Sequence, residues 1–318
     1  MLKTESKNRD NDIESPKSAP LVSICIPCYK NPDSFERCLV SVMEQTYSNF
    51  EVLITDDSPT NEIKELVELH FKDERVFYQK NLIQLGSPEN WNAGIALAKG
   101  EFIKILHHDD WFAQNDALAK FVDKALSTNA DFICSNCVNN LPDKKRKHKI
   151  LDRFKAKWSK DNSLILFSNL IGAPSVTFYK RQLRNPVLFD RDTFWFVDIL
   201  FYFDYVSANK RIEFIDDFLI NITAGSETQV TNSMVNAKIV MRELINIGQR
   251  LDLTHNQKSR LLYRVTMLEK MSKYKIRNLT ELATYMNGSL PLDAPFYFLR
   301  LPLPYRFYSV LKHIIMLF

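Results

Sequence analysis

Asp109 and Asp110 are the residues whose types and spacing most directly suggest chemistry in this chain. They follow the run Phe102–Leu106, which is mostly apolar and typical of a buried strand. Gly100, before that run, can take the left-handed backbone that ends a helix. Adjacent carboxylates repel each other, and a hard divalent cation takes oxygen ligands, so one interpretation of the pair is a metal site. The other is a solvent-exposed Asp-Asp at the start of the next helix, because Asp is a common N-cap.

The elements that would position this pair alternate between strands and helices. Short connections between alternating strands and helices predict an α/β fold, with a mostly parallel central sheet and helices on both faces. We expect the first strand to be stopped by Pro27 and the first helix to be capped by Asp33 or Ser34. The predicted strands are Leu21–Ile26, Phe50–Ile54, Val76–Tyr78, Phe102–Leu106 and Asp131–Ser135, and the later predicted helices are Glu62–Phe71, Glu89–Lys99 and Ala117–Ser127.

Polar residues follow the first, second and fourth of these strands. Pro27 and Tyr29 come after the first, Asp57 after the second, and Asp109 after the fourth. The carboxyl ends of parallel strands form the ligand-binding edge of such a sheet. The chain has only seven glycines and neither a G-x-G-x-x-G nor a G-x-x-x-x-G-K motif. A phosphate-bearing ligand would therefore need a metal and basic side chains, which supports the metal interpretation.

Five segments in the same order resemble family 2 glycosyltransferases over about residues 20–225. The resemblance implies a GT-A fold and transfer of a sugar from a nucleotide donor, usually UDP-linked, with inversion at the anomeric carbon. The matching segments are Val22–Tyr29, Leu39–Tyr47, Phe50–Ser58, Asn92–Ile103 and His107–Asp110.

The resemblance assigns roles to residues at the predicted sheet edge. Pro27 and Tyr29 would line the base and ribose pocket, and His108 is placed with them among the nucleotide-binding residues. Asp57 would accept a hydrogen bond from the uracil N–H. Asp109 would hold the metal, Mn²⁺ or Mg²⁺, that bridges the diphosphate.

His107 departs from the family pattern, which usually has Asp at this position in an Asp-x-Asp arrangement. His107 could be a metal ligand, since imidazole is a tolerable ligand for manganese. It could equally donate a hydrogen bond to phosphate. Asp110 is then the alternative ligand, or an N-cap.

Three later segments resemble the acceptor half of the family, namely Gly172–Phe178, Phe189-Asp190 and Phe196–Asp198. Asp198 falls where the family keeps its catalytic base, which the acceptor hydroxyl needs because it must lose its proton as it attacks. From the residues alone, Asp198 reads as a surface residue of an aromatic helix, and Asp192 and Asp204 are its rivals. The His or Arg that family members often carry after the last strand has no histidine equivalent in Ile222–Gln229.

Composition limits the other interpretations. The net charge of +4 over 318 residues is too small to indicate a nucleic-acid partner. The five cysteines include two C-x-x-C pairs, Cys25/Cys28 and Cys134/Cys137. Their separation makes zinc the lesser interpretation, so we expect reduced, packed thiols. Residues 1–20 are polar and no apolar run approaches the length of a membrane span, so we expect a cytosolic protein.

The chain divides into three predicted parts. Residues 1–19 should be a disordered tail, and residues 20–230 a catalytic domain with a nucleotide-sugar half to about 135 and an acceptor half from about 136. Residues 231–318 should be a helical extension that is basic from residue 251, with ten Lys and Arg against four Asp and Glu. The run 144–149 is either a solvated loop or a contact for a diphosphate lipid or membrane.

The last predicted helix, Tyr305–Phe318, is amphipathic. It would either lie in a bilayer interface or pack onto protein. Its expected apolar face is Phe307, Val310, Leu311, Ile314, Ile315 and Phe318, and its expected polar face is Arg306, Lys312 and His313.

The sequence thus predicts a metal-dependent, inverting glycosyltransferase. Its partners would be a nucleotide-sugar donor and a glycan or lipid-linked saccharide acceptor, with a peripheral contact at the inner face of the cell membrane. Two alternatives stay open. One is a nucleotidyltransferase, although the chain lacks the glycine- and Lys/Arg-rich segment expected after its first strand. The other is an inactive GT-A-like binding or assembly module.

Overall fold

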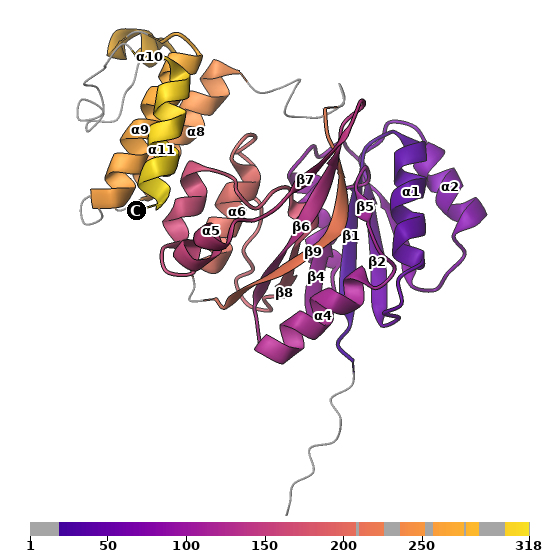
Figure 1. Ribbon diagram of the computed structural model, residues 1–318. Helices are drawn as coiled ribbons and strands as arrows, with labels where there is room; N and C mark the ends of the chain where they lie inside the picture. The colour runs from indigo at the N-terminus through magenta and orange to yellow at the C-terminus, as the bar shows by residue number, and fades with distance from the viewer. Residues whose placement is uncertain are drawn as a thin grey trace, which may run out of the picture.

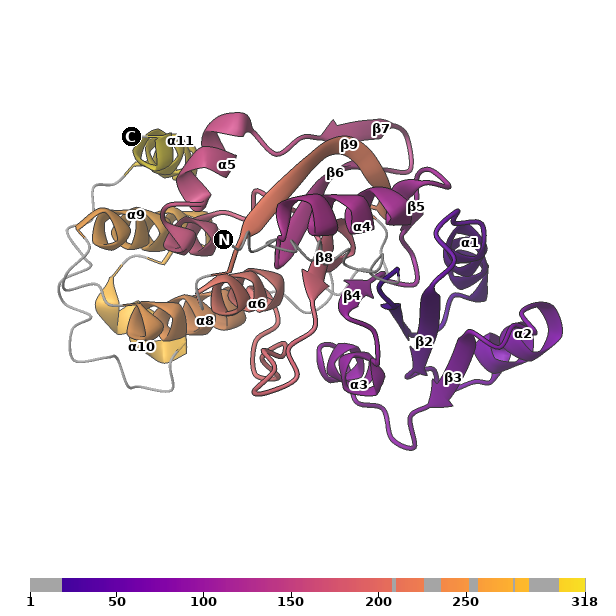
Figure 2. The ribbon, with the colours of Figure 1, turned by 90° about the horizontal axis from the view of Figure 1, so that it is seen from below.

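The computed structural model describes residues 19–207, 210–225, 236–251, 257–276, 278–285 and 303–317. Its centre is one sheet, with helices on both faces (Figures 1 and 2). The predicted α/β architecture is therefore confirmed. The strands are β1 (Val22–Cys28), β2 (Phe50–Asp56), β3 (Val76–Lys80), β4 (Phe102–Ile105), β5 (Trp111–Phe112), β6 (Phe132–Asn140), β7 (Lys145–His148), β8 (Thr177–Lys180) and β9 (Ile212–Thr223).

The helices follow the strands closely in the first half of the chain and form a separate layer in the second. Figure 2 shows α3 on one side of the parallel strands and α1 and α2 on the other. The α-helices are α1 (Pro32–Met43), α2 (Glu62–His70), α3 (Glu89–Leu97), α4 (Ala117–Thr128), α5 (Asp152–Trp158), α6 (Val197–Val206), α8 (Ala237–Arg250), α9 (Gln257–Lys273), α10 (Leu279–Tyr285) and α11 (Tyr305–Leu317), with 3₁₀ turns at Asn162–Phe167 and Pro174–Val176.

The strand order is β3-β2-β1-β4-β8-β6-β9-β5, and β7 pairs with β6. The first four strands of this order pair in parallel. Every residue of β1 and β2 is buried, as expected where helices cover both faces of a parallel sheet. The second half is mixed, because β8 runs antiparallel to β4 and β6 whereas β9 runs parallel to β6.

Pro27 lies inside β1 and does not stop it, contrary to the prediction. Its partner in β2 is Thr55. The backbone of Cys25 faces β4, because its carbonyl accepts the N–H of Leu106, the residue after that strand. Pro27 is two residues further along β1, so its nitrogen also faces the β4 side. It lies there beyond Ile105, the last residue of β4 that pairs with β1. The N–H that proline lacks would therefore have no ladder partner there.

Gly100 is required for close packing and not for a left-handed turn. A Cβ atom at Gly100 would lie 2.6 Å from the Ser23 nitrogen and 2.7 Å from the Leu21 oxygen. The Gly100 N–H donates to Ser23 Oγ at 2.8 Å, and Ser23 Oγ donates to buried Glu51 at 2.6 Å. The glycine thus lets the entry to β4 rest against the start of β1.

Two further local predictions were wrong. The N-cap of α1 is Asn31, whose side chain accepts the N–H of Ser34, and not Asp33 or Ser34. The basic run 144–149 is not a loop, because most of it forms β7 along β6. A strand forms there because β6 offers backbone partners from Cys137 to Asn140.

The C-terminal helices form their own layer, in which α11 packs along α9 (Figure 1). Lys312 is 4% exposed and donates to Glu269 of α9 at 2.5 Å, so its predicted place on a solvent-facing side was wrong. Phe307, Val310 and Ile314 are exposed, and the predicted residue Phe318 lies outside the described residues. Among the helices described, none is both long and apolar enough to span a bilayer.

Candidate active site

A cleft of about 660 Å³ opens at the carboxyl ends of the parallel strands. Its wall comes from the ends of β1 and β2, the segment 84–91 around the start of α3, the turn after β4, the segment 191–198, and the end of β9. All eight residues predicted from the sequence line this one cleft. They are Pro27, Tyr29, Asp57, His107, His108, Asp109, Asp110 and Asp198.

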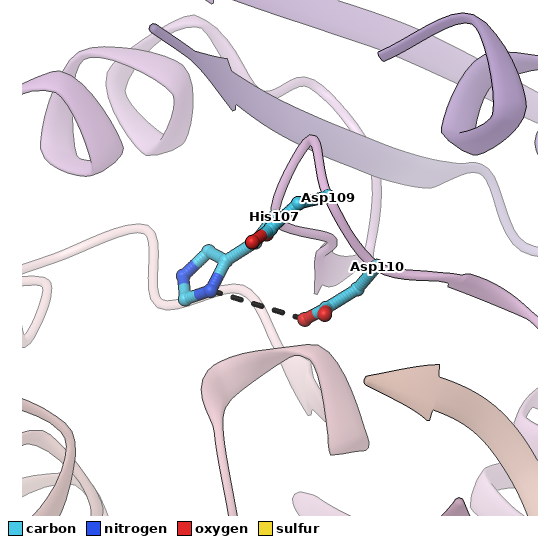
Figure 3. Close-up of side chains that lie close together, drawn as sticks. All are labelled: His107, Asp109 and Asp110. Atoms are coloured by element: carbon cyan, nitrogen blue, oxygen red, sulfur yellow. Dashed lines mark ion pairs between the residues drawn. The ribbon is translucent and has the colours of Figure 1, made fainter. Parts of the chain in front are cut away.

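His107, Asp109 and Asp110 form a cluster at the turn that follows β4 (Figure 3). One potential ligand atom from each lies within 4.8 Å of the other two, a group that could hold a metal ion. The turn is closed by the Asp110 N–H, which donates to the His107 carbonyl at 2.9 Å. No other such cluster of His, Cys, Asp or Glu occurs among the residues that the structure describes.

The His107 ring is held neutral and has a free nitrogen. Burial lowers the pKa of His107, although Asp109 opposes that shift. Its Nε2 atom is buried without a hydrogen-bond partner, and the centre of its ring lies 4.7 Å from the centre of the Trp91 ring. A neutral imidazole with an unpaired nitrogen suits a metal or phosphate contact, so the donor set fits a divalent cation.

Asp110 is fixed from the far side of the cleft. Its Oδ1 atom accepts the Thr223 N–H of β9 at 3.0 Å, which leaves Oδ2 facing His107 Nδ1 at 4.0 Å. Burial and the neighbouring Asp109 raise the pKa of Asp110. The positive charge of buried Lys104 acts in the opposite direction on the pKa of Asp110. Desolvation in turn lowers the pKa of Lys104 to about 7. A cation in the cluster would relieve the repulsion between the two carboxylates.

The Asp57 carboxylate already supports the wall of the cleft. Oδ1 accepts from Asn81 Nδ2 at 2.6 Å and from the Leu85 N–H at 3.1 Å, and Oδ2 accepts the Gly86 N–H at 2.6 Å. A carboxylate oxygen has two lone-pair positions, so Oδ2 can accept one more donor. Asp57 thus holds the segment before α3 and still has capacity for a ligand.

The other predicted nucleotide contacts flank Asp57. Tyr29 is 41% exposed, and Lys30 Nζ lies 4.9 Å from the centre of its ring. His108 approaches the Pro27 backbone, and burial lowers the pKa of its imidazole. Tyr29 and His108 thus contribute an aromatic ring and an uncharged imidazole to the lining of the cleft.

Asp198 enters the cleft from the first turn of α6. Its Oδ1 atom is buried and has no hydrogen-bond partner, and desolvation raises the pKa of Asp198 to about 7. Buried acceptors without partners are rare, and carboxyls with such pKa values concentrate at functional sites. The rivals differ, because Asp192 does not line the cleft and Asp204 lies 3.4 Å from Arg250.

Glu243 of α8 is a residue that sequence reasoning missed. Its carboxylate is 2% exposed and accepts three consecutive backbone N–H groups, those of Phe194, Trp195 and Phe196, at 2.8–3.0 Å. These residues lead directly into α6 and Asp198. No local signal marks Glu243, since its partners are almost fifty residues earlier. Trp91 was also missed, although it immediately precedes a matching segment.

The cysteines offer no metal site in the described part of the chain, although Cys28 lines the cleft. All five are free and buried, as expected, and none belongs to a potential metal cluster among the described residues. Burial raises the pKa of Cys25 and Cys134, so both remain thiols. The zinc interpretation therefore has no support in the described part of the chain.

Comparison with known proteins identifies the family to which the chain is similar. The family model described as Glycosyl transferase family 2 matches residues 23–187. A relative in Escherichia coli, "UDP-Glc:alpha-D-GlcNAc-diphosphoundecaprenol beta-1,3-glucosyltransferase WfgD", is 30% identical over 172 residues. The match covers 53% of this chain and 64% of WfgD, so it spans less than two thirds of that relative.

Two solved structures share the fold. S. aureus TarS 1-349, in complex with UDP-GlcNAc, superposes with a TM-score of 0.64 at 16% identity, over 84% of this chain and 79% of TarS. The mannosyltransferase PcManGT from Pyrobaculum calidifontis, in complex with GDP-Man and Mn²⁺, gives a TM-score of 0.57 at 15% identity, over 95% and 86% of the two chains. The likeness confirms the predicted GT-A fold.

Proposed function

This chain belongs to glycosyl transferase family 2, as its motifs predicted, and it is a glycosyltransferase; we propose that it moves a sugar from a UDP-linked donor to a hydroxyl of a glycan or lipid-linked saccharide, with inversion. The observation that carries the proposal is that Asp57, the His107–Asp110 cluster and Asp198 line one cleft. Family membership leaves the nucleotidyltransferase alternative without support.

The donor nucleotide would lie along Pro27, Tyr29, Asp57 and His108. The remaining acceptor capacity of Asp57 Oδ2 fits the N–H of uracil. The names of two similar proteins support the choice of nucleotide, because WfgD is named for UDP-Glc and TarS was solved with UDP-GlcNAc. His108 lies beside these residues and, being neutral, adds no positive charge to the site.

Asp109, His107 and Asp110 would hold Mn²⁺ or Mg²⁺. When bound, the ion supplies the positive charge that stabilises a diphosphate leaving group. Two carboxylates suit either ion, and the unpaired His107 Nε2 favours manganese, the borderline metal of the two. PcManGT, which shares the fold, was solved with Mn²⁺.

Asp198 would act as the general base. In an inverting transfer the acceptor oxygen forms its bond to the anomeric carbon as the bond to the diphosphate breaks. The hydroxyl proton then passes to Asp198 Oδ1, the oxygen that has no partner in the structure. A positioned base contributes roughly 10²–10⁴-fold to such a step, most efficiently when its pKa is close to the working pH.

The acceptor would enter beside the aromatic residues Phe194 and Trp195, which line the cleft next to Asp198. Aromatic faces suit the apolar faces of sugar rings. WfgD is named for a diphosphoundecaprenol-linked acceptor, which supports a lipid-linked saccharide here. The enzyme would then work at the inner face of the membrane, where the exposed apolar residues of α11 offer a peripheral contact.

A donor screen tests the proposal. UDP-, GDP- and dTDP-sugars, each with and without MnCl₂, should stabilise the chain unequally in a thermal-shift assay, with the largest rise in Tm for UDP-sugars with manganese. The same UDP-sugar should be hydrolysed slowly when no acceptor is present. Binding without any hydrolysis or transfer would instead indicate the inactive binding module.

A further inference from the structure

The most basic part of this chain is not its C-terminal region. Residues 144–160 contain nine Lys and Arg and one Asp, a net charge of +8, whereas the rest of the chain carries −4. This segment contains β7 and α5. Its charge exceeds the +4 of the whole protein, so the positive charge is concentrated in one place.

Most of this charge is exposed and unneutralised. We define the basic surface as Lys144, Lys145, Arg146, Lys147, Lys149 and Arg153, all exposed. Within the described residues, no carboxylate lies within 4.0 Å of Lys145, Arg146, Lys147 or Lys149. Lys144 has only the exposed Asp143, at 3.6 Å. Repulsion within such a cluster disfavours the folded state, and that repulsion falls when an anionic partner is bound.

The basic surface begins beside the cleft. In β6, Asn140 pairs with Lys145 of β7 on one side and with Thr223 of β9 on the other. Thr223 lines the cleft and donates to the Asp110 carboxylate. Strands β6 and β9 therefore lie between the first lysine of β7 and the turn that holds Asp110. A partner on this surface would lie next to the entrance of the active site.

Apolar residues are also exposed on elements that lie along the same side of the molecule as β7. Leu151, between β7 and α5, is 45% exposed, and Phe307 and Val310 of α11 are 47% and 60% exposed. The two views together show β7, α5 and α11 along one side, nearest the viewer in Figure 1 and along the upper edge in Figure 2. Exposed basic and apolar side chains on elements that share one side match a lipid headgroup layer and its acyl boundary.

We propose that the basic surface docks this enzyme onto a bilayer that contains anionic phospholipids. Each Lys or Arg near such a bilayer strengthens the attraction, and the effect acts over about 10 Å at 0.1 M salt. The exposed Leu151, Phe307 and Val310 favour a lipid partner over a nucleic acid. The inference rests on the proposed function only in that a lipid-linked acceptor would be presented at the same bilayer.

Vesicle flotation tests the docking without any sugar transfer. The full chain should float with phosphatidylcholine vesicles that contain phosphatidylglycerol, and not with pure phosphatidylcholine. The triple variant K145Q/R146Q/K147Q should bind roughly 100-fold more weakly, since each charge contributes roughly fivefold. The matched control K64Q/K72Q/K99Q removes three exposed lysines near the β3 side of the sheet and should bind like the unmodified chain.

Three results would overturn the proposal. They are flotation independent of phosphatidylglycerol, equal losses in both triple variants, and retention of a labelled RNA oligonucleotide by a chain that ignores the vesicles. Hydrolysis of the UDP-sugar should be the same in the K145Q/R146Q/K147Q variant as in the unmodified chain. If hydrolysis is absent in every form but flotation behaves as stated, the proposed function fails and the docking stands.

Discussion

The Oδ2 atom of Asp110 lies 4.0 Å from His107 Nδ1, across the turn that follows β4. That separation is too long for a strong hydrogen bond. The other oxygen, Asp110 Oδ1, accepts a hydrogen bond from the Thr223 N–H of β9. Asp110 Oδ2 and the His107 imidazole therefore stay apart, with Asp109 beside them. The three groups are better placed to share a cation than to neutralise one another.

The substitution Asp109→Ala should weaken manganese-dependent binding of UDP by about tenfold or more, because it removes a carboxylate from the proposed metal site. Isothermal titration with UDP, with MnCl₂ and then with EDTA, measures the effect. Asp192→Ala, outside the cleft, is the matched control. Unchanged binding by Asp109→Ala would remove that residue from the site.

The substitution Asp198→Asn should lower kcat by roughly 10²–10⁴-fold, since Asn cannot accept the hydroxyl proton. UDP binding should persist, because Asp198 lies in the part of the cleft that we assign to the acceptor. The comparison variant Asp204→Asn alters a residue close to Arg250 and should transfer at nearly the normal rate. Normal turnover by Asp198→Asn would refute the base assignment.

The rate of transfer should rise with pH up to about 7 and then level, because Asp198 must be ionised to act and its pKa is raised to about 7. A rate that is flat from pH 5 to pH 8 would contradict this. Buffers of equal ionic strength are needed, because salt screens the exposed charges.

The same raised pKa makes a prediction about stability. The folded state holds the Asp198 proton more tightly than the unfolded state, whose pKa is near 3.8, so the stabilisation is full below that value and is lost as pH rises toward 7. Asp198→Asn should escape this loss. Its free energy of unfolding relative to the parent should increase between pH 4 and pH 8, by up to about 4 kcal/mol. A constant difference would contradict the burial of an unpaired carboxyl.

The substitution Glu243→Gln should loosen the segment 194–196, because one amide oxygen replaces two carboxylate oxygens and the NH₂ group faces N–H donors. Amide hydrogen exchange of Phe194, Trp195 and Phe196 should accelerate, at a cost of about 1–3 kcal/mol in stability. KM for the acceptor should rise more than the Kd for UDP. The exposed Glu36→Gln serves as the control, and unchanged exchange at 194–196 would contradict the role of Glu243.

The substitution Gly100→Ala should destabilise the chain by about 1–3 kcal/mol or more, because the added Cβ would meet backbone atoms of Leu21 and Ser23 at 2.6–2.7 Å. Gly86→Ala has no atom within 4 Å of its Cβ but has a φ of +76°, so it should cost about 1 kcal/mol. Chemical denaturation of both variants compares a steric cost with a conformational one.

Much of the fold could be predicted because apolar runs and helical spacing are local signals. The strands from β1 to β4 and the helices between them lie where these signals predict them, within a few residues. The carboxyl ends of parallel strands converge on one edge, so the sequence alone was enough to predict that Asp57 and Asp109 lie together. Asp198 could be added only through the resemblance, because its own helix reads as apolar and aromatic.

The rest depends on contacts between distant segments. Glu243 gives no local sign of its three backbone partners, and β7 forms because β6 leaves an edge free beyond β8. The place of Lys312 was predicted wrongly because helical spacing separates charged from apolar residues and cannot reveal a buried partner such as Glu269. The reason for Gly100 was also missed, since a close approach by β1 leaves no trace near residue 100.

Strand β7 has a second consequence, which concerns self-association. Among the described strands it pairs with β6 alone, so no described strand covers its outer edge. Lysine and arginine along such an edge discourage a second copy from adding there, because two like-charged strands would lie about 5 Å apart. The positive charge beside the active site would thus also keep this sheet from extending into an aggregate.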